Sequence, residues 1–91
     1  MNQPVKIIKL SEVIVLSKLS KTSVYERVKH QLMPPPFSMG GRSAGYYEHE
    51  VNRVIAAMAA GYSDNEIKSL VKSFIEKRKQ VANDLIASLA A

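Results

Sequence analysis

The chain has 91 residues, of which 46% are hydrophobic, and it carries a formal net charge of +5 and no cysteine. This length allows one small domain and leaves no room for a catalytic domain joined to a substrate domain. The absence of cysteine excludes disulfides, thiolate metal sites and cysteine nucleophiles. The N-terminus lacks the apolar core of a signal peptide, and the longest apolar runs, 13–16 and 54–60, are far too short to span a membrane. We therefore expect a soluble intracellular protein.

The basic residues are concentrated in the first half of the chain. Between residues 6 and 42, seven basic residues oppose two glutamates and give this segment a net charge of +5, so the remaining segments sum to zero. The basic residues are Lys6, Lys9, Lys18, Lys21, Arg27, Lys29 and Arg42. This distribution favours a polyanion as partner. A generic basic surface is the alternative, and charge alone does not separate the two.

The N-terminal third predicts two helices joined by a short turn. Residues 6–10 are β-branched and basic, and are either a brief strand or an extended lead-in. Ser11 is expected to cap a helix that runs to Lys18, with Glu12 at the positive end of its dipole. The two-residue connection 19–20 is short enough that the next helix must start at a steep angle.

The second helix is predicted over 21–32, with Ser20 as its cap. Val24, Val28 and Leu32 recur at i, i+4 and i+8 and form its buried stripe. At 100° per residue, the exposed face carries Thr22, Glu26 and Lys29. Tyr25 and Arg27 flank the stripe on opposite sides.

Three prolines at 34–36 end the helical pattern, and a hairpin follows. Segments 37–39 and 44–47 are expected to be two short strands joined through Gly40-Gly41-Arg42, because paired glycines accept the positive φ values of tight turns. Phe37, Met39 and a tyrosine are expected to supply its inward face.

Two further helices complete the predicted fold, which is mainly α with a small β-hairpin. A helix over 48–60 should stop at Gly61, and Ser63 with Glu66 forms a capping box that starts a helix over 64–90. Residues 1–62 form the predicted helix-turn-helix and hairpin unit, and 63–91 a C-terminal helix within the same structural domain.

No catalytic or metal site can be assembled from the residues. The segment 49–53 resembles a zinc protease motif, but Arg53 stands where the second histidine is required. Glu48 and Glu50 would diverge on a helix, so we assign them to the helix N-terminus rather than to acid–base chemistry. We expect no enzyme, no cofactor, no metal and no small-molecule ligand.

Three features together favour binding to double-stranded DNA. The start of helix 21–32 offers free N–H groups and a positive dipole end to a phosphate. Its exposed face projects groups that pair with base edges or phosphates, and Arg42 at a hairpin tip suits a minor groove or a phosphate. Each feature taken alone also fits an ordinary solvated surface. The expected DNA contacts are Lys18, Ser20, Lys21, Thr22, Ser23, Tyr25, Glu26, Arg27, Lys29, Gly41, Arg42 and Ser43.

Four segments carry a resemblance to a known family. The segments 8–13, 19–28, 34–46 and 48–51 are similar to the AlpA family of phage and genomic-island regulators, within a match over about residues 6–60. The Gly-Gly-Arg with the downstream Gly-aromatic pair is the most specific part. The resemblance implies a winged helix-turn-helix related to MerR-type regulators and to excisionases, with a recognition helix at 21–32 and a wing at 37–47.

The resemblance also implies a role and a setting. It implies activation of integrase expression or direction of the excision of a mobile element, in the bacterial cytoplasm and at the nucleoid. Carried over by position, the contacts are Ser20, Lys21, Thr22, Ser23, Tyr25, Arg27 and Arg42. This chain departs from the family at Glu26, Pro35 and Ser38, where basic residues are common, and at Tyr46, where tryptophan is common. Excisionase and transcriptional regulator remain alternatives, and an integrase is a possible partner.

The C-terminal helix carries an apolar stripe interrupted by residues 77–80. We expect its second half to support self-association, because a pair of chains brings two copies of the basic segment 6–42 to DNA and multiplies the phosphate contacts. The expected oligomerisation residues are Phe74, Val81, Leu85 and Leu89. Packing within the chain is the alternative, and a protein-interaction module that uses this helix is a third possible function.

Overall fold

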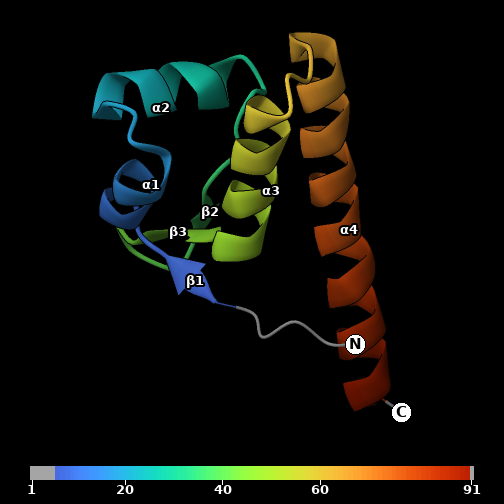
Figure 1. Cartoon of the computed structure of the whole chain (residues 1–91). Coiled ribbons are helices and arrows are strands. Elements are labelled where there is room, and N and C mark those ends of the chain that lie inside the picture. Colours follow the sequence, from blue (N-terminus) through green and yellow to red (C-terminus); the bar gives the residue numbers. More distant parts are fainter. Residues whose placement is uncertain (1–5, 91) are drawn as a thin grey trace.

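The computed structural model describes residues 6–90, which contain four helices and three short strands (Figure 1). In chain order these are β1 (Ile7–Ile8), α1 (Leu10–Ser17), α2 (Lys21–Lys29), β2 (Phe37–Ser38), β3 (Ala44–Tyr47), α3 (Glu48–Ala59) and α4 (Asp64–Ala90). The predicted order of helix-turn-helix, hairpin, helix and long helix is confirmed, as is the winged helix-turn-helix fold with an added C-terminal helix.

The three strands form one antiparallel sheet in the order β1-β3-β2. Ile7 pairs with Tyr47 in β3, and Phe37 pairs with Gly45. The segment 6–10, left open between strand and lead-in, therefore contributes a strand. Because β1 closes one edge, the β2–β3 hairpin, called the wing below (residues 37–47), leaves the domain from a sheet and not from a loop.

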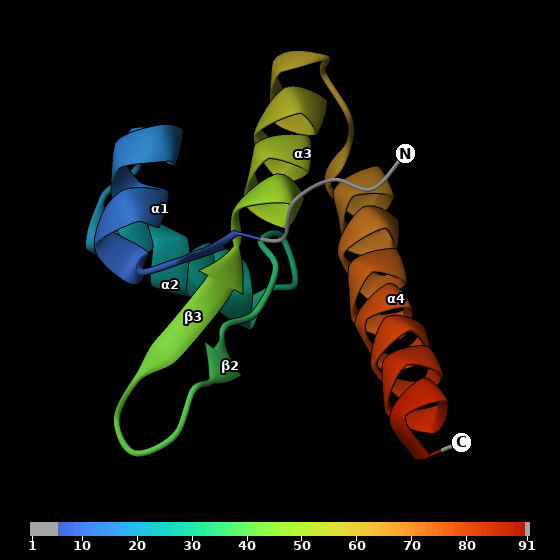
Figure 2. The ribbon, with the colours of Figure 1, turned by 90° about the horizontal axis from the view of Figure 1, so that it is seen from below.

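The wing is shaped by three glycines. Gly40 and Gly41 have φ values of 96° and 56°, which confirms the predicted turn, and Ser43 donates its N–H to the Gly40 carbonyl at 3.1 Å. Figure 2 shows the tip extending away from the helices. Met39 lies on this projecting part and is 53% exposed, so its predicted inward position is wrong. The strand alternation holds, but the core does not reach that far along the hairpin.

Gly45 is required for a close approach and not for a turn. A Cβ at this position would lie 2.6 Å from Cγ2 of Ile7 and 3.3 Å from Cε2 of Phe37. Since β1 and β2 flank Gly45 on either side, any side chain here would push the two outer strands away from β3.

The first helix starts two residues earlier than predicted, because its N-cap is Lys9 and not Ser11. Lys9 occupies the N-cap position, and its backbone N–H donates to Oε1 of Glu12 at 3.4 Å. The helix ends at Lys18, which adopts the left-handed conformation with φ 60° and donates its N–H to the Ile14 carbonyl at 2.9 Å. A lysine in this conformation is strained, because its Cβ crowds the following carbonyl.

The second helix is capped as predicted but is three residues shorter. Ser20 Oγ accepts from the Ser23 N–H at 3.1 Å. The helix ends at Lys29, since Gln31 turns to φ 60° and the Leu32 N–H bonds back to the Arg27 carbonyl at 2.7 Å. This left-handed turn brings the next residues back beneath the helix, where Met33 becomes completely buried.

The last two helices are bounded as predicted. Gly61 follows α3 with φ 83°. Ser63 and Glu66 form a reciprocal capping box, with the Ser63 N–H donating to Glu66 Oε1 at 3.0 Å and the Glu66 N–H donating to Ser63 Oγ at 3.2 Å. The backbone hydrogen bond from Ser63, followed by that with its hydroxyl, lowers the pKa of Glu66.

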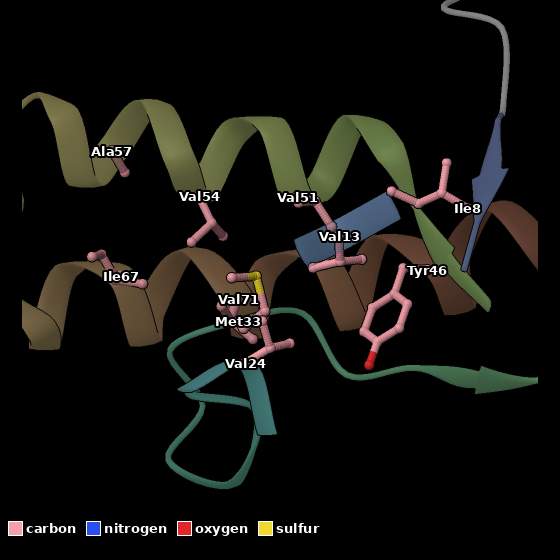
Figure 3. Close-up of a cluster of buried hydrophobic side chains, with 10 residues drawn as sticks. All are labelled: Ile8, Val13, Val24, Met33, Tyr46, Val51, Val54, Ala57, Ile67 and Val71. Atoms are coloured by element: carbon pink, nitrogen blue, oxygen red, sulfur yellow. The ribbon is translucent and has the colours of Figure 1, made fainter. Parts of the chain in front are cut away.

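The core lies where α1, α2, α3 and the first half of α4 meet the inner face of the sheet (Figure 3). Val24 alone from α2 is fully buried, while Val28 and Leu32 are half-buried against the cluster. The first half of α4 supplies Ile67 and Val71 to the same cluster. The buried residues are Ile8, Val13, Val24, Met33, Tyr46, Val51, Val54, Ala57, Ile67 and Val71.

Candidate nucleic-acid interface

The start of α2 presents an ordered group of small polar and basic side chains. Ser20 holds the first turn, and its hydroxyl also contacts the Ser23 hydroxyl at 2.9 Å. Lys21 and Thr22 are exposed beside the cap, and Lys18 is exposed at the preceding turn. Because the helix dipole and the free N–H groups both favour an anion at this end, these cations add to an attraction that the backbone already creates.

The outer face of α2 is open to solvent, as the periodicity predicted. Thr22, Glu26 and Lys29 are all exposed. Glu26 Oε2 lies 3.5 Å from Nε2 of His30, one turn further along the helix. This face therefore offers a hydroxyl, a carboxylate and an ammonium group in successive turns, which are groups that pair with base edges or phosphates in a major groove.

Arg27 differs from the other basic residues of α2. It is half-buried, and its Nε and Nη2 atoms are buried without a hydrogen-bond partner among the described residues. Such nitrogens raise the free energy of the folded state until they find an acceptor. Less of its guanidinium is open to a phosphate than the pattern predicted.

Tyr25 and Tyr46 bring α2 next to the wing. Burial raises the pKa of Tyr46 above its ordinary value of 10.0, and the Tyr25 phenol adds a smaller electrostatic contribution in the same direction. Tyr25 belongs to α2 and Tyr46 to β3. Tyr25 is 50% exposed, and the Lys21 ammonium lies 5.8 Å from its ring centroid. Tyr46 is only 2% exposed, so of the two tyrosines only Tyr25 is open to a ligand.

The tip of the wing carries the remaining predicted contacts. Gly41, Arg42 and Ser43 are all exposed. The Met39 N–H donates to the Ser43 carbonyl at 2.9 Å and closes the loop, so Arg42 stands on a defined turn. An arginine on such a projecting turn can enter a minor groove or contact a phosphate beyond the reach of α2.

Sequence reasoning missed the residues that brace the wing from behind. Glu50 is only 2% exposed, and both of its carboxylate oxygens accept hydrogen bonds from Arg78 of α4. The periodicity contained the signal, because Glu50 shares the buried stripe of α3 with Val54 and Ala57. The sequence alone places Glu50 at the N-terminal end of the α3 dipole, whereas the structure shows that it forms this ion pair.

The four predicted oligomerisation residues do not share one environment. Phe74 is half-buried and packs against the core, whereas Val81, Leu85 and Leu89 are 43%, 61% and 87% exposed. Ile86, which the prediction omitted, is 65% exposed and lies on the same distal part of α4. The part of α4 up to Arg78 therefore packs within the chain, and residues 81–89 do not.

Within residues 6–90, no group of three or more histidine, cysteine or carboxylate side chains is placed to hold a metal ion. In the same part of the chain, no helix combines the length and the apolar character that crossing a bilayer requires.

The fold and the surface define a small winged helix-turn-helix protein with a polar, capped second helix beside a basic-tipped wing. Residues 6–58 match the family described as prophage CP4-57 regulatory protein (AlpA), so the chain belongs to the AlpA family of phage-type regulators. No curated protein and no solved structure matches the chain. The match covers the helix-turn-helix, the wing and nearly all of α3, and leaves α4 outside the family pattern.

Proposed function

We propose that this protein binds double-stranded DNA of a mobile element, with α2 in the major groove and the wing against the neighbouring backbone or minor groove. The observation that carries the proposal is the exposed, capped start of α2 together with the exposed turn that holds Arg42 at the tip of the wing, in a member of a phage regulator family. The contacts are the twelve residues predicted from the sequence, with Arg27 contributing mainly its charge.

The role that fits best is that of an excisionase, or recombination directionality factor. Several copies would bind repeated sites near an attachment region, bend the DNA and help to position an integrase. Activation of an integrase gene uses the same residues and is the alternative. An excision assay and an integrase-promoter reporter, run with the same variants, separate the two roles.

The binding proposal is tested by removing one cation from each half of the surface. Lys21→Ala with Arg42→Ala should weaken the retardation of attachment-region DNA strongly. It should also reduce the salt slope by nearly two, because about 0.9 counterion is released per phosphate contact. The matched control is Lys68→Ala with Lys72→Ala, which removes the same charge from the exposed face of α4. Unchanged retardation by the first variant would contradict the proposal.

A second proposal concerns the distal half of α4, where residues 81–89 are all exposed. Val81, Leu85, Ile86 and Leu89 are all exposed and give this segment an apolar surface, which can mark an interaction site. We propose that a second copy covers it. If the two α4 helices cross antiparallel at Leu85, Lys79 of one copy lies beside the last turn of the other. That last turn contains no basic residue, so Lys79 supplies the positive charge that its negative dipole end attracts.

The self-association is tested by light scattering after size-exclusion chromatography. Leu85→Glu should convert a dimer to a monomer, whereas Gln80→Glu, which adds the same charge at an exposed position nearby, should not. A monomer in the unchanged chain at micromolar concentration would contradict it. If deletion of 80–91 abolishes the main cellular activity while DNA retardation survives, the helix serves a different protein partner.

A further inference from the structure

Arg78 on α4 contacts three separate parts of the domain. Its Nε donates to Oε2 and Oε1 of Glu50 at 3.0 and 3.2 Å, and its Nη2 also pairs with Oε1. The same Nη2 donates to the carbonyl of Pro35 at 3.0 Å. The side chain is 18% exposed. One guanidinium thus joins α4 to the first turn of α3 and to the proline segment that leads into the wing.

The guanidinium also lies against the two residues at which the wing leaves the domain. Its Cζ is 5.3 Å from the ring centroid of Phe37 and 5.5 Å from that of Tyr47. Phe37 begins β2 and Tyr47 ends β3, and their rings are 4.7 Å apart. Arg78 therefore contacts both roots of the wing at once.

We propose that Arg78 is a positioning residue for DNA binding, which fixes the direction of the wing and so the place of Arg42. This inference rests on the DNA-binding function proposed above. Arg42 lies on the turn that begins about three residues beyond Phe37, which is about 10 Å at roughly 3.3 Å per residue. At that length, a rotation of about 10° at the root moves the tip by about 2 Å, which is enough to break a phosphate contact.

The outer part of the wing has little support of its own. β1 pairs only with Tyr46 and Tyr47, so from Gly45 outward the wing is a two-stranded hairpin whose β2 has only two residues, and short two-stranded hairpins are marginally stable in water. The chemistry of arginine suits the task, since its planar fork grips a carboxylate in one orientation and its face stacks on aromatic rings. A buried ion pair adds little stability over apolar residues of the same volume, so an orienting role explains its presence better than stability does.

The test is a double-mutant cycle on DNA affinity, measured by fluorescence anisotropy. Arg78→Lys keeps the charge that compensates Glu50 but loses the fork and the flat face. It should weaken binding about five- to tenfold in the normal chain and hardly at all in Arg42→Ala, because both changes remove the same wing contact. Arg53→Lys, the same substitution on the exposed face of α3, should leave affinity unchanged in both backgrounds.

The outcomes separate the inference from the proposed function. If Arg42→Ala weakens binding and Arg78→Lys adds its full effect to it, the inference is overturned and the DNA-binding function stands. If Arg42→Ala leaves affinity unchanged, the wing does not contact DNA, and both the positioning role of Arg78 and the wing contact in the proposed function are rejected.

A readout without DNA gives a second measure. Arg78→Lys should shift the amide NMR signals of Gly40 and Gly41 while that of Thr22 stays in place, and unmoved wing signals would count against the inference. If Arg78→Lys does not fold, Arg78→Gln with Glu50→Gln, which leaves no uncompensated charge, takes its place in both experiments.

Discussion

Glu50 and Arg78 lie 28 residues apart in the sequence and form the ion pair that ties α4 to the start of α3. Glu50→Gln removes one charge and leaves the other in a largely buried position, so we expect the free energy of unfolding to fall by about 3 kcal/mol. Urea denaturation measures it. Glu48→Gln is the control, because the Glu48–Lys6 pair at 3.4 Å is solvent-exposed and contributes less than about 1 kcal/mol. A similar decrease in the free energy of unfolding from both changes would show that the buried pair contributes no more stability than the Glu48–Lys6 pair.

Gly45 is expected to tolerate no side chain. Gly45→Ala should destabilise the fold by about 1–3 kcal/mol, because its Cβ would meet Ile7 at 2.6 Å. Ile7 is 44% exposed, so Ile7→Ala alone should cost little. The same Ile7→Ala change should restore most of the stability of Gly45→Ala, as thermal unfolding would show. No rescue would mean that the clash lies with Phe37 instead.

Tyr46 should make the fold sensitive to alkali. Burial, helped by Tyr25, raises its pKa in the folded state above 10.0, whereas the unfolded chain releases this proton at the ordinary value. The folded state then binds more protons, so this contribution to stability is complete below about pH 10 and decreases as the pH rises through the folded pKa. Chemical denaturation at pH 9 and pH 11 should show the decrease, and Tyr46→Phe should make it smaller. Tyr62→Phe, at an exposed tyrosine, serves as the control.

Lys18 is expected to lower the free energy of unfolding while it raises the affinity for DNA. Its φ of 60° strains any residue with a side chain, so Lys18→Gly should raise the free energy of unfolding by up to about 1 kcal/mol. The same change removes a cation beside the start of α2 and should weaken DNA binding. Gln31→Gly is a matched control, because Gln31 has the same φ of 60° but no charge. It should add stability without weakening DNA binding.

Glu26 should oppose binding to DNA of arbitrary sequence. Its carboxylate is exposed on the face of α2 that we place against DNA, where it repels phosphates. Glu26→Gln should therefore raise the affinity for random-sequence DNA by about two- to fivefold at low salt. Glu12→Gln makes the same charge change on the exposed surface of α1, away from the proposed contacts. An equal gain in affinity from both variants would show that the net charge of the protein, and not the position of Glu26, causes the effect.

Local signals predicted the elements well, because they act over a few residues. The caps at Ser20 and Ser63, the stop at Gly61 and the turn at Gly40 all depend on neighbouring atoms, and the structure confirms each of them. The misjudged boundaries have a different cause. The end of α2 is set by Gln31 turning left-handed so that Met33 can enter the core, and this tertiary gain is invisible to periodicity.

The candidate site was predicted in part. Helical spacing identified the exposed face of α2, and the paired glycines identified the tip of the wing. The proximity of Tyr25 to Tyr46 and the contacts of Arg78 depend on how distant segments pack, which no spacing rule encodes. Arg78 shares the inner stripe of α4 with Val71 and Phe74. Its charge led us to treat it as part of an interruption in that stripe.

The contacts that hold the wing also determine when it can form. Ile7 pairs with Tyr47 across 40 positions of the chain, and Arg78 reaches Pro35 across 43. The α1–α2 turn, by contrast, closes through neighbours only a few residues apart. Because distant contacts require large loops to close before they stabilise anything, we expect the two helices to form first and the wing last. During synthesis, a chain that has not yet reached residue 78 carries a helix-turn-helix whose wing has no fixed direction.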